Sequence, residues 1–161
     1  MKRIGVTGHR HIPDELHTHV RAAMTAVFDG HRGGAPLEAL SSLAVGADTL
    51  FADIALASGA ELTVVVPSGD YEDGFADAAE LARYRALKDR ATREVRLPYA
   101  HATDEAYYAA GAYIADNCDR LLAVWDGAPS RGLGGTADIV EYARALGKPV
   151  TVIWRAGVKR P

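Results

Sequence analysis

The sequence lacks the marks of several protein classes. It contains a single cysteine, Cys118, so the chain cannot hold an internal disulfide, and no histidine lies near this thiol in sequence to activate it. No apolar run approaches the roughly 18 residues of a membrane span. The first residues carry the cations Lys2 and Arg3 but too few apolar side chains for a signal peptide. We therefore expect a cytoplasmic protein that does not contact a membrane.

An excess of charge of one sign is also missing. The 161 residues include 18 basic and 21 acidic side chains, a formal net charge of −3, which gives no strong overall attraction to nucleic acid. The one arginine-rich segment, residues 83–96, also contains Asp89 and Glu94, a pattern typical of a solvated helix face. Because binding driven by counterion release needs clustered cations, a nucleic-acid partner is disfavoured.

The usual cofactor and metal motifs are absent as well. Gly8 stands alone where the dinucleotide fingerprint G-x-G-x-x-G needs three glycines, and no G-K-[ST] sequence follows it, which argues against ordinary NAD or ATP enzymes. The closest histidine pairs, His9 with His11 and His17 with His19, lack the i, i+4 spacing that sets two ligands on one helical face. We expect no metal and no cofactor.

The sequence does contain a regular alternation of short apolar runs and amphipathic segments. The length and a composition of 48% hydrophobic and 24% charged residues fit one domain over residues 1–161, with 155–161 as a loose tail. The valines at 64–66 indicate a strand buried on both faces, which Pro67 ends. Strands are predicted at 4–7, 39–45, 61–66, 94–97, 120–125 and 149–154, with helices between them. This rhythm predicts an α/β fold: a Rossmann-like open, mostly parallel sheet of five to seven strands with helices on both faces.

Small and polar residues collect where these strands end. Ligands of an open parallel sheet bind outside the carboxyl ends of its strands. The site candidates are therefore Gly8, His9, Arg10, Gly46, Asp48, Gly132, Gly134, Gly135 and Thr136. The glycines let a backbone approach a ligand, and Thr136 can cap a helix whose N-terminus would hold a phosphate. The spacing of these residues fits flexible, solvent-facing loops with a threonine cap and no ligand equally well.

Motifs at these positions resemble the SLOG superfamily of Rossmann-like proteins. They are Thr7 to Arg10, Ser42 to Asp48, and Asp119 to Gly127 leading to Gly134 to Asp138. The superfamily includes the Lonely Guy phosphoribohydrolases, molybdenum-cofactor carriers, DNA-uptake processing proteins and stand-alone domains thought to bind nucleotides. The chain is most similar to the stand-alone branch, with its T-G-[HY]-R, G-x-D and G-G-T motifs.

The resemblance implies a nucleotide site. It places Gly134, Gly135 and Thr136 on the phosphate, with Gly8, Arg10 and Gly46 lining the rest and Asp48 and Asp126 as polar walls. A small-molecule nucleotide or nucleotide derivative is therefore the expected partner, and a homodimer is left open. Neither aspartate requires a ligand: the helix dipole favours Asp48 at a helix N-terminus, and Asp126 is a common turn residue.

The alternative is an enzyme that hydrolyses the N-glycosidic bond of a nucleoside monophosphate. Alignment with the Lonely Guy pattern P-G-G-x-G-T-x-x-E puts Ile139 where the family has a glutamate thought to act on the ribose. An isoleucine cannot exchange a proton, so we expect binding without hydrolysis. The carboxylates left as catalytic candidates are Asp48, Asp126 and Glu141, of which Glu141 lies two residues further along the helix and projects elsewhere.

Overall fold

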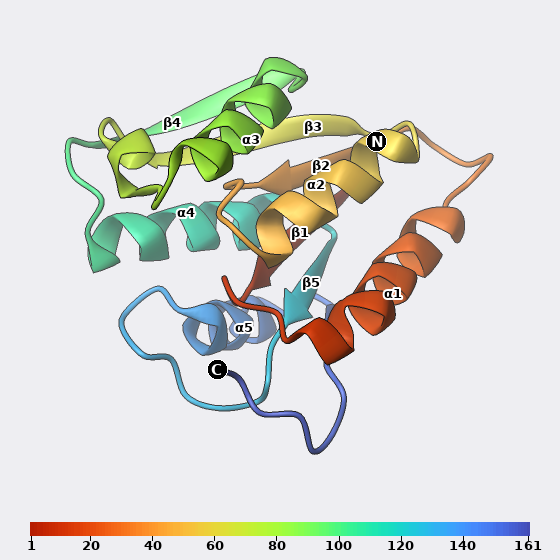
Figure 1. Ribbon diagram of the computed structural model, residues 1–161. Coiled ribbons are helices and arrows are strands. Elements are labelled where there is room, and N and C mark those ends of the chain that lie inside the picture. The colour runs from red at the N-terminus through yellow and green to blue at the C-terminus, as the bar shows by residue number, and fades with distance from the viewer.

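The computed structural model describes residues 1–161 and contains one six-stranded sheet in which every strand pair is parallel (Figure 1). The sheet order is β4-β3-β2-β1-β5-β6. The strands are β1 (Lys2–Gly8), β2 (Leu37–Ser41), β3 (Glu61–Ser68), β4 (Arg93–Tyr99), β5 (Arg120–Val124) and β6 (Val150–Ile153). The predicted Rossmann-like fold class is confirmed.

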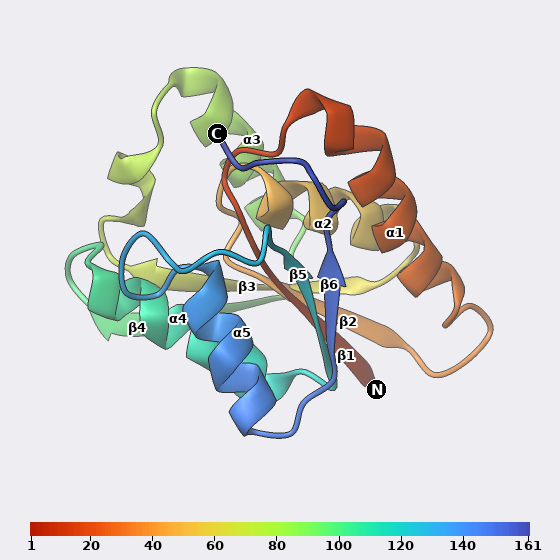
Figure 2. The same ribbon diagram turned by 90° about the horizontal axis from the view of Figure 1, so that it is seen from below.

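Helices cover both faces of the sheet. One layer holds α1 (His17–Asp29), α2 (Ala47–Ala57) and α3 (Ala78–Asp89), and the other holds α4 (Asp104–Asn117) and α5 (Thr136–Ala145) (Figure 2). Short 3-10 turns, η1 (Asp14–Leu16) and η2 (Tyr71–Gly74), precede α1 and α3. None of these helices is long and apolar enough to span a bilayer.

The core consists of two clusters, one on each face of the sheet. The larger holds 26 buried residues beneath α1, α2 and α3, and the smaller holds 9 beneath α4 and α5. Along β3, Val64 and Val66 point into the larger cluster and Val65 into the smaller. The run of valines is therefore buried on both faces, as the sequence predicts, because successive side chains of a strand alternate between faces.

Several element boundaries differ from the prediction. Strand β3 continues through Pro67 to Ser68, because a register shift between Val66 and Ser68 removes the regular ladder bond that proline cannot make. Strand β4 includes Pro98, which an edge strand tolerates. Strand β2 ends at Ser41 rather than at residue 45, since the chain turns at Leu43, a residue with a φ of 57°.

Thr103 caps the N-terminus of α4. The Thr103 side chain accepts a hydrogen bond from the Ala106 N–H at 3.2 Å. Residues 155–161, expected as a loose tail, fold back towards the sheet. The Trp154 indole N–H donates to the Val158 carbonyl at 2.8 Å, and the Arg160 side chain is 14% exposed. Figure 2 shows this dark blue segment passing near the segment that follows β1.

The strand order reverses beside β1. From β1 the chain builds β2, β3 and β4 on one side, and α4 then carries it back to β5 on the other side. Gly8 at the end of β1 pairs with Val124 at the end of β5. This is the switch point at which open α/β sheets bind their ligands.

Candidate functional site

A cleft of about 490 Å³ opens at this switch point. Its walls come from the segment after β1, the start of α2, one face of α4, and the loop that leads into α5. Among its lining residues are Gly8, His9, Arg10, Asp48, Gly132, Gly134, Gly135 and Thr136. The structure thus brings together candidates separated by more than 100 positions in sequence.

Three other candidates lie outside the cleft lining. Gly46 has a φ of +89°, and its α-carbon packs so closely against the carbonyls of His9 and Arg10 that a side chain has no room. Gly46 therefore packs against the backbone of His9 and Arg10, the segment that follows β1. Asp126 lies behind His9, and Glu141 is exposed on α5.

The glycine loop, residues 132–135, ends at an uncapped helix. Gly135 is the N-cap of α5 and has no side chain to accept a hydrogen bond, so the expectation that Thr136 would cap this helix is wrong. The Gly135 and Asp138 N–H groups donate to the Gly132 carbonyl and to Ser130 Oγ. The N–H groups of Thr136 and Ala137 have no acceptor in the protein. An anion in the cleft would satisfy them.

Two cations of the cleft are free of ion pairs. Arg10 and Arg131 both line it, and neither forms a salt bridge. The Arg10 guanidinium lies over the ring of Tyr107, 5.5 Å from its centroid. Asp104, beside Gly132, is the acidic group nearest to the glycine loop on the α4 side.

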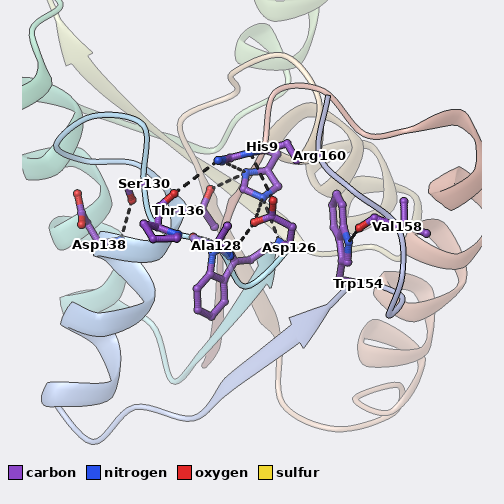
Figure 3. Close-up of polar contacts among 11 residues, drawn as sticks. His9, Asp126, Ala128, Ser130, Thr136, Asp138, Trp154, Val158 and Arg160 are labelled. Atoms are coloured by element: carbon purple, nitrogen blue, oxygen red, sulfur yellow. Dashed lines mark hydrogen bonds and ion pairs between the residues drawn. The ribbon is translucent and has the colours of Figure 1, made fainter.

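His9 joins three elements beneath the cleft (Figure 3). Its side chain is buried, and its Nε2 lies 3.1 Å from the Asp126 backbone nitrogen and 3.2 Å from Asp126 Oδ1. Its Nδ1 lies 3.3 Å from Thr136 Oγ1 and 3.3 Å from a guanidinium nitrogen of Arg160. The ring also meets Trp154 edge-on at 5.5 Å. His9 thus ties β1 to the ends of β5, α5 and β6.

The ionisation of this cluster follows from its burial. Desolvation and the charge of Arg160 lower the pKa of His9, so the ring is neutral at pH 7. Polar contacts hold the ring on both edges: Nε2 faces Asp126, and Nδ1 faces Thr136 and Arg160. Burial alone would raise the pKa of Asp126, but the hydrogen bond from the Ala128 N–H, the contact with His9 and the charge of Arg160 lower it.

Asp48 is a cleft residue whose pKa lies near physiological pH. It lies in the first turn of α2 and is 9% exposed. Burial raises its pKa to about 7, although a hydrogen bond from the Ala44 N–H at 3.3 Å and the charge of Arg10 oppose that rise. A carboxyl in this state can donate or accept a proton at physiological pH.

The remaining wall is largely apolar. Ile139 of α5 lines the cleft and packs directly against Gly111 of α4, which leaves no room for a side chain at residue 111. The position aligned with the Lonely Guy glutamate therefore carries a hydrocarbon surface. Pro67, Tyr71 and Tyr107 extend this wall.

Three further cleft residues, Arg160, Tyr71 and Tyr107, are not among the candidates that the sequence predicts. Arg160 lies in the segment expected as a loose tail, and nothing in its neighbourhood signals a contact with His9, which is 151 positions away. Tyr107 carries the helical spacing of an ordinary packing residue. Only the fold, which brings α4 and the last segment to the end of β1, places these side chains at the cleft.

Comparison with solved structures finds the same architecture at low sequence identity. The chain matches the X-ray structure of DNA processing protein A from Streptococcus pneumoniae with a TM-score of 0.71 and 20% identity, over 99% of this chain and 52% of the other. The chain therefore shares the overall fold of that protein. It spans about half the length of that DNA processing protein A chain. No protein-family model matches this sequence, and no curated protein matches it.

The solved proteins that share this fold differ in what they bind. DNA processing protein A from Helicobacter pylori, which has a single-stranded DNA binding mode, matches with a TM-score of 0.64 and 13% identity, over 97% of this chain and 67% of the other. The molybdenum cofactor carrier protein of Chlamydomonas reinhardtii matches with a TM-score of 0.55 and 18% identity, over 94% and 75%. The fold alone therefore does not decide between nucleic acid and a small molecule.

The arginine-rich segment, residues 83–96, is mostly neutralised by ion pairs. Its cations form ion pairs with carboxylates on α2, η2 and the neighbouring strands. The pairs are Arg83 with Asp53, Arg85 with Glu72, Lys88 and Arg96 with Glu94, and Arg93 with Glu38 and Glu61. Arg83, Arg85 and Lys88 lie on α3, as predicted for a solvated helix face, whereas Arg93 and Arg96 lie on strand β4. The ion pairs leave little of this segment free to bind phosphates.

Proposed function

We propose that the cleft binds a nucleotide or a nucleotide-derived small molecule, with a phosphate on the glycine loop and the first turn of α5. The observation that carries this proposal is the pair of N–H groups of Thr136 and Ala137 that have no acceptor. They lie at an uncapped helix N-terminus, where the helix dipole also favours an anion. The unpaired Arg10 and Arg131 supply countercharge in the same cleft.

The rest of the cleft fits a base and a sugar. Its volume of about 490 Å³ lies within the range of roughly 300 to 1,000 Å³ typical of small-molecule sites. Tyr107 offers a half-buried ring beyond the phosphate end, and Tyr71 and Pro67 also line the cleft but are buried. A planar base would gain from contact with such rings. The polar phosphate end and the apolar wall together match the two-part chemistry of a nucleotide.

Asp48 supports hydrolysis of a nucleoside monophosphate as a second candidate function. In such a reaction water adds to the anomeric carbon, the bond to the base breaks, and the departing base takes up a proton. A carboxyl with a pKa of about 7 could supply that proton. The apolar Ile139 argues against it, because no carboxylate faces the ribose from α5 at that position. Binding without turnover is therefore the leading proposal.

Calorimetric titration with AMP, GMP, CMP and UMP tests the binding proposal. At least one nucleotide should bind the parent protein. Arg10→Ala should weaken that binding about tenfold or more, as expected for the loss of a charge-assisted hydrogen bond. Arg32→Ala is the matched control, because Arg32 is exposed, pairs with Asp29 and lies outside the cleft. Equal affinities of parent and Arg10→Ala protein would place the nucleotide elsewhere.

Gly135→Val tests the loop itself. A side chain at residue 135 would collide with Ser130 and fill the space beside the free N–H groups, so nucleotide binding should be lost while the distant core stays folded. Gly30→Val is its control, since Gly30 ends α1 with ordinary backbone angles and has room for a side chain. Nucleotide binding by the Gly135→Val protein at the parent's affinity would contradict the proposed phosphate position.

A further inference from the structure

A second hollow, of about 510 Å³, adjoins the cleft. It lies between the segment after β1, the start of α1 and the turn before α2. Arg10 lines both the cleft and this hollow, which we call the second hollow. The other charged or titratable side chains of the second hollow are His11, Asp14, His17, Arg21 and Arg83. The two concavities therefore share one arginine as a lining residue.

The second hollow holds two unpaired cations, Arg10 and Arg21. Arg10 and Arg21 form no ion pair, whereas Arg83 is paired with Asp53. Asp14 is the single carboxylate among the lining side chains, and it forms no ion pair either. Two unpaired guanidinium groups around an open concavity are the arrangement that recognises phosphate oxygens.

The backbone at the boundary between cleft and second hollow is held firmly. The Ala47 N–H donates to the His9 carbonyl at 3.2 Å, and Gly46 packs against the carbonyl of Arg10. On the cleft side the Arg10 guanidinium rests on Tyr107. Arg10 therefore occupies a defined position between the two concavities, where one guanidinium can face anionic groups from either side.

From this arrangement we infer that the second hollow is a subsite for a second phosphoryl group of the same ligand. The inference rests on the proposed function and narrows its ligand class. The ligand is a nucleotide with two phosphoryl groups separated by the sugar or a linker, one on the glycine loop and one between Arg10 and Arg21. A nucleoside monophosphate fills only the cleft.

Paired titrations test this subsite. Each nucleoside 5′-monophosphate is compared with the 3′,5′-bisphosphate of the same nucleoside, so that the second phosphoryl group is the only difference. For at least one base the parent protein should bind the bisphosphate about tenfold more tightly or better. Arg21→Ala should remove most of that gain without changing the affinity for the monophosphate. Arg32→Ala, also an exposed arginine near α1 but outside the second hollow, should change neither.

The outcomes separate the inference from the function on which it rests. If monophosphates bind but bisphosphates gain nothing, the second subsite is refuted and the proposed function stands. A gain that survives Arg21→Ala refutes the subsite in the same way. If neither ligand series binds, the proposed function fails and the subsite fails with it. A gain in affinity from the second phosphoryl group that disappears in Arg21→Ala and persists in Arg32→Ala supports the inference.

Discussion

Arg160 Nε and Asp126 Oδ2 lie 3.5 Å apart, joining the segment after β6 to the end of β5 (Figure 3). The Arg160 Nε is buried and has no hydrogen-bond acceptor, although the carboxylate is near. A buried guanidinium with incomplete pairing is costly, and an anion in the adjoining cleft would offset that cost. Arg160 thus links the last segment of the chain to the ligand end of the sheet.

Arg160→Ala should raise the pKa of His9, because the charge of Arg160 is one of the causes that lower it. The same substitution should weaken nucleotide binding about tenfold. The His9 pKa is measured by NMR titration of its ring signals. Arg155→Ala is the control, since Arg155 is exposed in the same segment and forms no ion pair. An unchanged His9 pKa in the Arg160→Ala protein would show that the two side chains do not interact in solution.

Asp48→Asn should stabilise the protein at high pH. The folded state raises the pKa of Asp48 to about 7 from an ordinary 3.8, so ionisation costs free energy only in the folded protein. That cost grows as the pH rises from about 4 to 7 and is absent below this window. The stability gain of Asp48→Asn should therefore be about 1 to 3 kcal/mol larger at pH 8 than at pH 5. Urea unfolding at both values measures it, and an equal gain at both would show that Asp48 titrates normally.

Gly46→Ala should destabilise the fold more than Gly59→Ala. Both glycines have positive φ values, 89° and 85°, which cost another residue roughly 1 to 2 kcal/mol, and Gly46 also has a ψ of −123°, outside the left-handed helical region. Only the side chain at residue 46 would also meet the carbonyls of His9 and Arg10. An additional cost of about 1 to 3 kcal/mol is expected from this overlap. Equal unfolding free energies for the two variants would remove the supporting role assigned to Gly46.

The purified protein should release no free base from AMP, GMP, CMP or UMP, even where it binds them. Ile139 offers no carboxylate to the ribose, and Glu141 is exposed outside the cleft. Chromatography of long incubations at high protein concentration provides the measurement. Base in excess of the protein concentration, lost in both Asp48→Asn and Gly135→Val, would establish the hydrolase in place of the binding protein.

The sheet and its helices could be predicted because burial on both faces leaves a periodic signal. The valines of β3 and the alternation of runs reflect the two core clusters directly. The ends of elements were less predictable. Pro67 and Pro98 usually stop strands, but a register shift and an edge position remove the bonds that they cannot make.

The candidate site was predictable only where its residues follow a strand. His9 and Arg10 stand directly after β1, so the switch-point rule places them at the cleft. Arg160 and Tyr107 reach the cleft through long-range packing, which no local pattern records. Gly46 shows the converse: its place after β2 favoured a ligand contact, whereas in the fold its closest neighbours are the carbonyls of His9 and Arg10.

The most direct test of the central claim is an NMR titration that follows the backbone amide signals of Thr136 and Ala137. These N–H groups have no acceptor in the protein, so a bound phosphate would become their hydrogen-bond partner. Addition of AMP, GMP, CMP or UMP should shift both signals to saturation for at least one nucleotide. If all four nucleotides leave both signals in place, or shift only amides remote from the cleft, the phosphate does not bind at the start of α5 and the account is wrong.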